Sequence, residues 1–168
     1  VKLETSLMSY AFPTEERKLG NYILDALRTE EDEFIATYDL GTFPMRVQSL
    51  NRTLIDKVFA VCDYYLLDKP HRNARHLYDI YKLTKHVEMD SDFLELVKEV
   101  RAHRITMGSE IAPSAPMDVN IVELVQKICD EDFYKEDYRE TTLKLISESL
   151  EYEMLKRHYK ELVEKIFV

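Results

Sequence analysis

The sequence predicts an α+β protein, with a small N-terminal sheet and one helix in residues 1–50 and a mainly helical part in residues 51–168. Two observations predict this. Short runs before Asn51 alternate apolar with polar residues, whereas later apolar residues recur at helical spacing. The chain also has only three glycines, far below the average usage of about 7%. This scarcity excludes the glycine-rich phosphate loops of Rossmann and P-loop proteins.

The N-terminal part is expected to hold three strands and a helix. Residues 1–7 alternate as a strand does, and Thr14 followed by two glutamates fits the first turn of a helix that buries residues 19–27 on one side. Residues 34–38 and 45–50 read as two further strands. The glycine and proline between them predict a turn, and hence an antiparallel hairpin.

The second part is expected to be an antiparallel helical array. A break at residues 68–70 and a proline-containing loop at 108–116 divide it. Asp90 is expected to cap the third helix. The expected helices cover residues 53–67, 71–86, 91–105, 119–128 and, as one helix or a pair, 134–166.

Composition limits the function. The net charge of −9 argues against general coating of nucleic acid, so any contact with a nucleotide or RNA should be local. No apolar run approaches the ~20 residues of a membrane span, and no signal-peptide pattern is present, so we expect no membrane partner. Cys62 and Cys129 lie in apolar helical patterns, which favours reduced core thiols in a cytoplasmic protein.

One group of charged residues stands out. Spacings of three and four put Arg72, Arg75, Asp79 and Lys82 on one face of an expected helix. They could simply be a solvated face with an Arg75–Asp79 pair. Lys57 lies in the preceding helix, just before five apolar residues. It either extends past its neighbours to water or points at something that needs a cation.

Two segments carry a resemblance to a known family. Residues 51–60 (NRTLIDKVFA) and 72–83 (RNARHLYDIYKL) resemble the R-T-x-x-(E/D)-K and R-x-x-R-H-x-x-D-(L/I) segments of the nucleotidyl transferase AbiEii/AbiGii toxin family. The spacing from Lys57 to Asp79 is 22 residues.

Flanking segments resemble the family more loosely. Residues 2–4 (KLE) are similar to the last strand of its catalytic sheet, and residues 132–138 (DFYKEDY) to its acidic C-terminal helical region. The resemblance therefore covers most of the chain.

The resemblance implies a nucleotidyltransferase of the polymerase-β type. Such a protein would be the toxin of a toxin–antitoxin or phage-defence (abortive infection) system, with a cognate antitoxin. It would transfer a nucleotide from a nucleoside triphosphate to an acceptor such as tRNA. Lys57 would hold the triphosphate, and Asp79 would act near the nucleotide or the attacking hydroxyl. Arg72 and Arg75 would bind phosphate oxygens through their planar donors.

The resemblance also implies Mg²⁺ on an Asp-x-Asp pair that follows a Gly-Ser turn. We expect this half of the site upstream of Val1, so that the chain is the C-terminal part of the enzyme and inactive alone. Glu4 is a candidate remaining carboxylate of the metal site, with a structural salt bridge as the alternative. Three local matches are rejected because they lack the strand context or fit a helix cap: Gly108-Ser109 ahead of Asp118, Asp90-Ser91-Asp92, and Asp130-Glu131-Asp132.

The positions of Lys57 and Asp79 can be predicted from the links between helices. The short break before the second helix makes consecutive helices neighbours, so Lys57 and Asp79 should open onto one surface, facing the strand with Glu4.

Other chemistry finds little support in the sequence. The five histidines have no spacing that suggests a zinc site. The alternative function is a non-catalytic helical module that binds a partner protein.

Overall fold

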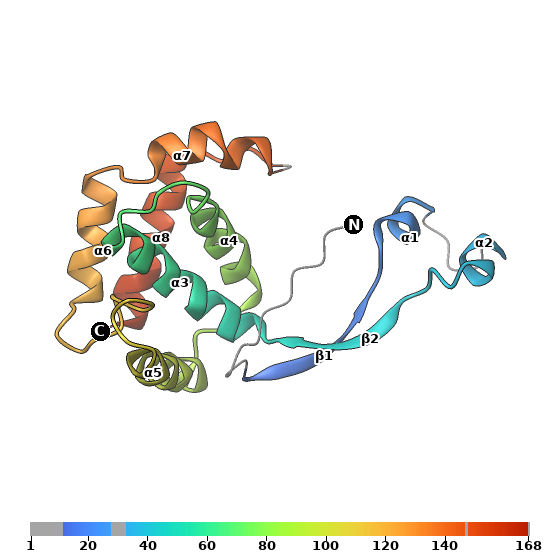
Figure 1. Cartoon of the computed structure of the whole chain (residues 1–168), viewed down its shortest axis with the longest axis horizontal. Helices are drawn as coiled ribbons and strands as arrows, with labels where there is room; N and C mark the ends of the chain where they lie inside the picture. The colour runs from blue at the N-terminus through green and yellow to red at the C-terminus, as the bar shows by residue number, and fades with distance from the viewer. Residues whose placement is uncertain (1–11, 28–32, 147, 168) are drawn as a thin grey trace. The chain divides into compact units, whose positions relative to one another are not determined.

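The computed structural model describes residues 12–27, 33–146 and 148–167. The expected strand at residues 1–7, which includes Glu4, lies outside this part of the chain. The chain divides into two compact units, Val1–Ser49 and Leu50–Val168 (Figure 1). One contains the described strands and the other is helical, so the α+β class is confirmed.

The first unit contains a two-stranded antiparallel sheet. Strand β1 (Thr14–Leu19) pairs with β2 (Phe43–Gln48). Thr14 lies opposite Gln48, and Leu19 lies opposite Phe43. Two short helices, α1 (Tyr22–Leu27) and α2 (Glu33–Thr37), lie between the strands in sequence.

The expected helix start at Thr14 is wrong, because residues 14–19 form β1. The pairing with β2 overrides the local capping signal, and it sets Glu16 opposite Arg46, a cross-strand pair of opposite charge. The helix begins later. The side chain of Asn21 accepts hydrogen bonds from the backbone amides of Ile23 (3.1 Å) and Leu24 (3.0 Å), so Asn21 is the cap.

The expected strand at residues 34–38 is also wrong, and with it the hairpin to residues 45–50. Residues 33–37 form α2, and β2 pairs with β1 instead. The rings of Phe34 and Tyr38 lie 4.6 Å apart, which is the i,i+4 contact of a helix. In a segment of five residues this contact competes with any strand pattern.

The second unit is a helical array (Figure 1). The elements of this unit are α3 (Leu50–Leu66), α4 (Arg75–Leu83), η1 (Thr84–His86), α5 (Ser91–Thr106), α6 (Ile121–Asp130), α7 (Lys135–Glu140), η2 (Thr142–Lys144) and α8 (Tyr152–Ile166). Helix α3 contacts α4, α5 and α6, and α8 packs against α4 and α6.

Most expectations for this unit are confirmed. Asp90 caps α5, since its side chain accepts a hydrogen bond from the backbone amide of Phe93 (2.9 Å). Within the described residues, no strand pairing occurs beyond residue 53. The second helix differs from the expectation: it starts at Arg75 rather than at residue 71, because residues 71–74 form a turn.

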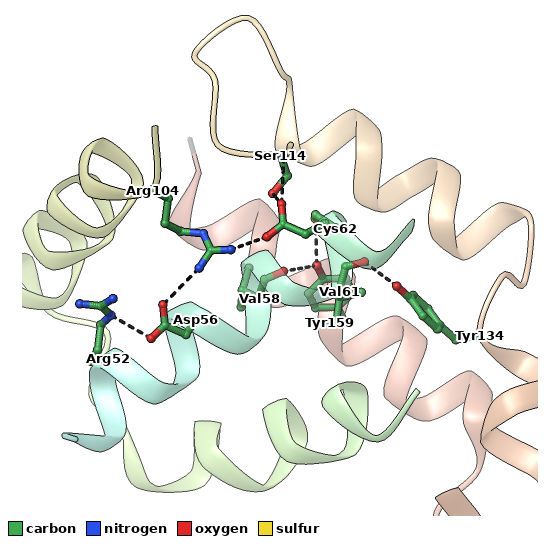
Figure 2. A network of polar contacts seen from close by, with 10 residues as sticks. Arg52, Asp56, Val58, Val61, Cys62, Arg104, Ser114, Tyr134 and Tyr159 are labelled. Carbon is green, nitrogen blue, oxygen red and sulfur yellow. Dashed lines mark hydrogen bonds and ion pairs between the residues drawn. The ribbon is translucent and has the colours of Figure 1, made fainter. Parts of the chain in front are cut away.

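Helix α3 is buried on most of its surface. Six of its apolar side chains belong to the core: Leu54, Ile55, Val58, Phe59, Val61 and Cys62. Two buried tyrosines from other segments reach its backbone (Figure 2): the Tyr159 hydroxyl donates to the Val58 carbonyl (2.9 Å), and the Tyr134 hydroxyl to the Val61 carbonyl (2.6 Å). Each phenol thus keeps a hydrogen bond inside the core.

A buried polar network holds α5 and the loop after it to α3 (Figure 2). The side chain of Asp63, 5% exposed, forms an ion pair with Arg104 of α5. It also accepts hydrogen bonds from the amide (2.9 Å) and hydroxyl (2.6 Å) of Ser114. The Arg104 guanidinium also approaches Asp56 (3.5 Å) and lies over the ring of Phe59, 5.2 Å from its centre.

We predict that Arg104→Met lowers the free energy of unfolding by about 3–5 kcal/mol, because it leaves the Asp63 carboxylate buried without its cation. Lys98→Met on the same helix is the control. The Lys98 side chain is 75% exposed and pairs with the exposed Glu95, so we expect a change of about 0.5 kcal/mol or less. Urea denaturation measures both, and equal losses would contradict the assigned role of Arg104.

Cys62 and Cys129 are free, buried thiols. Burial is the main cause that raises the pKa of Cys62 to about 12 and that of Cys129 to about 11. Because the thiolate is the nucleophile, we predict that iodoacetamide near neutral pH modifies neither cysteine in the folded protein and both in urea. Intact-mass spectrometry reads the result. Rapid labelling of the folded protein would contradict the buried positions.

Candidate functional site

The structure brings Lys57 and Asp79 together. Lys57 lies in α3 and Asp79 in α4, and these neighbouring helices place the Lys57 Nζ atom 2.8 Å from Asp79 Oδ2. The Lys57 side chain is 27% exposed and that of Asp79 is 35% exposed. The ion pair therefore opens to solvent on one surface of the helical unit. The strand with Glu4 that this surface was expected to face is outside the described residues.

His76 completes the group. Its Nδ1 atom lies 3.2 Å from Lys57 Nζ and 3.7 Å from Asp79 Oδ2. The imidazole is stacked on the ring of Tyr64, with centres 5.7 Å apart and planes 9° apart, and its side chain is only 9% exposed. We call Lys57, His76 and Asp79 the Lys57 cluster.

His76 stands in the second segment that resembles the family, but from the sequence it was weighed only as a zinc ligand. Helical spacing could have identified it. His76 lies three residues before Asp79 on α4, and Tyr64 lies seven residues after Lys57 on α3, so each pair shares a face of its helix.

The charges in the cluster are set by its surroundings. Burial is the largest cause that lowers the pKa of His76, with help from the charges of Lys57 and Arg75 and against the effect of Asp79. Burial raises the pKa of Asp79, but His76 and Lys57 lower it more, so the net direction is downward. These shifts favour a neutral imidazole at His76 and a carboxylate at Asp79 near neutral pH.

Arg72 and Arg75 lie close in sequence to this cluster and are exposed. Arg72 is in the turn before α4, with a positive φ of 63°, so it does not follow the helical spacing expected of it. The intrahelical Arg75–Asp79 pair is not formed, because the Asp79 carboxylate engages Lys57. Lys82 pairs with Glu148 at 2.8 Å.

Asp137 of α7 fixes the turn that leads into α4. Its carboxylate accepts hydrogen bonds from the backbone amides of Arg72 (2.7 Å) and Ala74 (2.9 Å), and from the hydroxyl of Thr141 (2.9 Å). Ala74 occupies the N-cap position of α4 and has no side chain that could cap it. A carboxylate from a helix far along the sequence thus satisfies the backbone amides of the turn that leads into α4. Sequence reasoning placed Asp137 in an acidic region and missed this role.

We predict that Asp137→Asn lowers the free energy of unfolding by about 1–3 kcal/mol, since an amide offers one oxygen where the carboxylate offers two. Amide hydrogen exchange at Arg72 or Ala74 should become faster. Glu136→Gln is the matched control on α7, because the Glu136 side chain is 64% exposed and contacts Arg139. Unchanged exchange in Asp137→Asn would contradict the proposed role of Asp137 in holding this turn.

The described residues do not fit a Mg²⁺ site. Across residues 12–27, 33–146 and 148–167, no group of three or more His, Cys, Asp or Glu side chains could hold a metal ion. The rejected acidic run is engaged elsewhere: Asp130 accepts from Gln126, Glu131 from Tyr65, and Asp132 pairs with Lys135 and Lys156. Glu4, the candidate metal ligand, lies outside these residues.

In the part of the chain that the structure describes, every helix is too short or too polar to cross a membrane.

In a comparison with protein families, the model of the nucleotidyl transferase AbiEii toxin family, described as a type IV TA (toxin–antitoxin) system, matches residues 1–168. The chain belongs to this family. The family is one of nucleotidyltransferase toxins, and it implies a nucleotide substrate and a cognate antitoxin. No curated protein and no solved structure matches the chain significantly.

Proposed function

We propose that this chain supplies the triphosphate-binding side of a nucleotidyltransferase toxin, with Lys57 and Asp79 at the reacting nucleotide. The observation that supports this most is the Lys57–Asp79 ion pair, at 2.8 Å and open to solvent. Two residues 22 positions apart meet there, and both lie in the segments that carry the resemblance to the family.

Lys57 would act as a point charge on the triphosphate. In nucleotidyl transfer the acceptor hydroxyl attacks the α-phosphorus and pyrophosphate leaves, so negative charge grows on phosphate oxygens. An ammonium has three donors. Asp79 and His76 are within reach of two of them, and the third remains for a phosphate oxygen. Such a fixed cation stabilises developing negative charge without reorganising during the reaction.

Asp79 and the two arginines would complete the binding surface. The lowered pKa of Asp79 keeps it ionised, so it can accept a hydrogen bond from a hydroxyl of the nucleotide or of the acceptor. The exposed guanidinium groups of Arg72 and Arg75 are suited to phosphate oxygens, which they can bind with two donors at once.

The finer parts of the proposal rest on the family. We propose a nucleoside triphosphate as donor, an RNA such as tRNA as acceptor, and phage defence in the cytoplasm as the setting. Mg²⁺ belongs to the proposal for the complete protein, although the described residues do not fit a site for it.

In the complete protein we predict that Lys57→Ala lowers nucleotide incorporation into an RNA pool at least ~100-fold, because it removes a preorganised cation. The melting temperature should stay nearly the same, since a partly exposed ion pair contributes about 1 kcal/mol or less. Radiolabelled nucleoside triphosphates measure incorporation.

Lys82→Ala is the control, because Lys82 also pairs with a carboxylate at 2.8 Å but lies outside the Lys57 cluster. It should retain activity. Retained activity in Lys57→Ala would refute the proposed role. Absence of triphosphate binding by the unmodified complete protein would instead favour the non-catalytic interaction module.

A further inference from the structure

We propose that His76 is a positioning residue of this site, whose unprotonated Nδ1 holds the Lys57 ammonium in the direction from which it meets the triphosphate. The inference rests on the proposed function and adds a residue to which neither the resemblance nor the family match gives a role. It depends on the geometry of two contacts and on the way the imidazole is held.

The first contact fixes the tautomer. An ammonium only donates hydrogen bonds, so a nitrogen 3.2 Å from Lys57 Nζ must be the acceptor. The proton of the neutral ring is then on Nε2. The 3.7 Å between Nδ1 and Asp79 Oδ2 is too long for a hydrogen bond, so His76 serves Lys57 rather than Asp79.

The imidazole is a rigid support for this contact. Its ring is buried and stacked on Tyr64 of α3. Its backbone amide donates to the Asn73 carbonyl (3.1 Å), within the turn that Asp137 holds. The lysine, in contrast, has a flexible four-carbon stem. Asp79 alone would leave the ammonium free to turn about one contact, whereas two separate acceptors define where its third donor points.

The arrangement predicts a pH dependence. The charged or titratable groups that face His76 are Lys57 and Tyr64 from α3 and Arg75 and Asp79 from α4. Burial and the two cations lower the pKa of His76, and Asp79 opposes them. The neutral ring is therefore present at neutral pH and is lost only as the pH falls through this lowered pKa. A protonated Nδ1 would repel Lys57 and compete with it for Asp79.

Two variants in the complete protein test the inference. His76→Leu removes the acceptor and keeps an apolar side chain of similar size, so we expect KM for the nucleoside triphosphate to rise about tenfold, with a smaller change in kcat. His76→Asn can place an amide oxygen where Nδ1 lies. His76→Asn should bring KM back to near its original value. It should also shift the low-pH side of the profile of activity against pH. His86→Asn, at an exposed histidine, should leave KM and the profile unchanged.

A second measurement is independent of activity. Imidazole ¹⁵N chemical shifts of the full chain near neutral pH should show His76 neutral, with Nδ1 unprotonated. A ring protonated on Nδ1 would overturn the inference. So would an unchanged KM in His76→Leu, or equal losses in His76→Leu and His76→Asn. If Lys57→Ala is inactive while His76→Leu behaves like the original protein, only the role of His76 fails; if Lys57→Ala is active, the proposed function fails and the inference with it.

Discussion

A helix buried on most sides must neutralise every charge that it carries, and this constraint organises the helical unit. Helix α3 has charged side chains among its buried ones, and an unpaired charge there would be costly. Asp63 finds Arg104 and Ser114, which fastens α5 and the following loop. Lys57 finds Asp79, at the packed contact with α4. The array and the candidate site thus arise from the same requirement.

Hydrogen bonds from other segments hold the backbone of both helices that form the site. On α3, the backbone carbonyls of Val58 and Val61 accept hydrogen bonds from buried tyrosines, one turn or less from Lys57. On α4, the carboxylate of Asp137 holds the turn before the helix and so sets where His76 and Asp79 lie. The flexible lysine is the mobile part of the cluster, and its acceptors are attached to fixed backbone.

The sequence predicted the helical unit well, since long segments with helical spacing leave little ambiguity. Asp90 was identified as a cap from its position, and a short link was enough to predict that Lys57 and Asp79 share a surface. The first unit was predicted poorly. Residues 14–19 carry a helix-start signal, yet a partner strand about thirty residues later decides their structure. Asp137 was missed because its contacts join segments far apart in the sequence, whereas His76 was missed although helical spacing places it on the same face as Asp79.

The positions of four polar residues around the axis of α3 limit the changes of length that this helix can accept. Asp56 and Asp63 are seven residues apart and both meet Arg104, while Lys57 and Tyr64, also seven apart, both meet His76. The two pairs are offset by one residue, which is about 100° around the helix. An insertion of one residue between Lys57 and Asp63 would carry the aspartate to the side of His76 and away from Arg104. A change in the length of α3 within this segment would therefore disturb both sets of contacts.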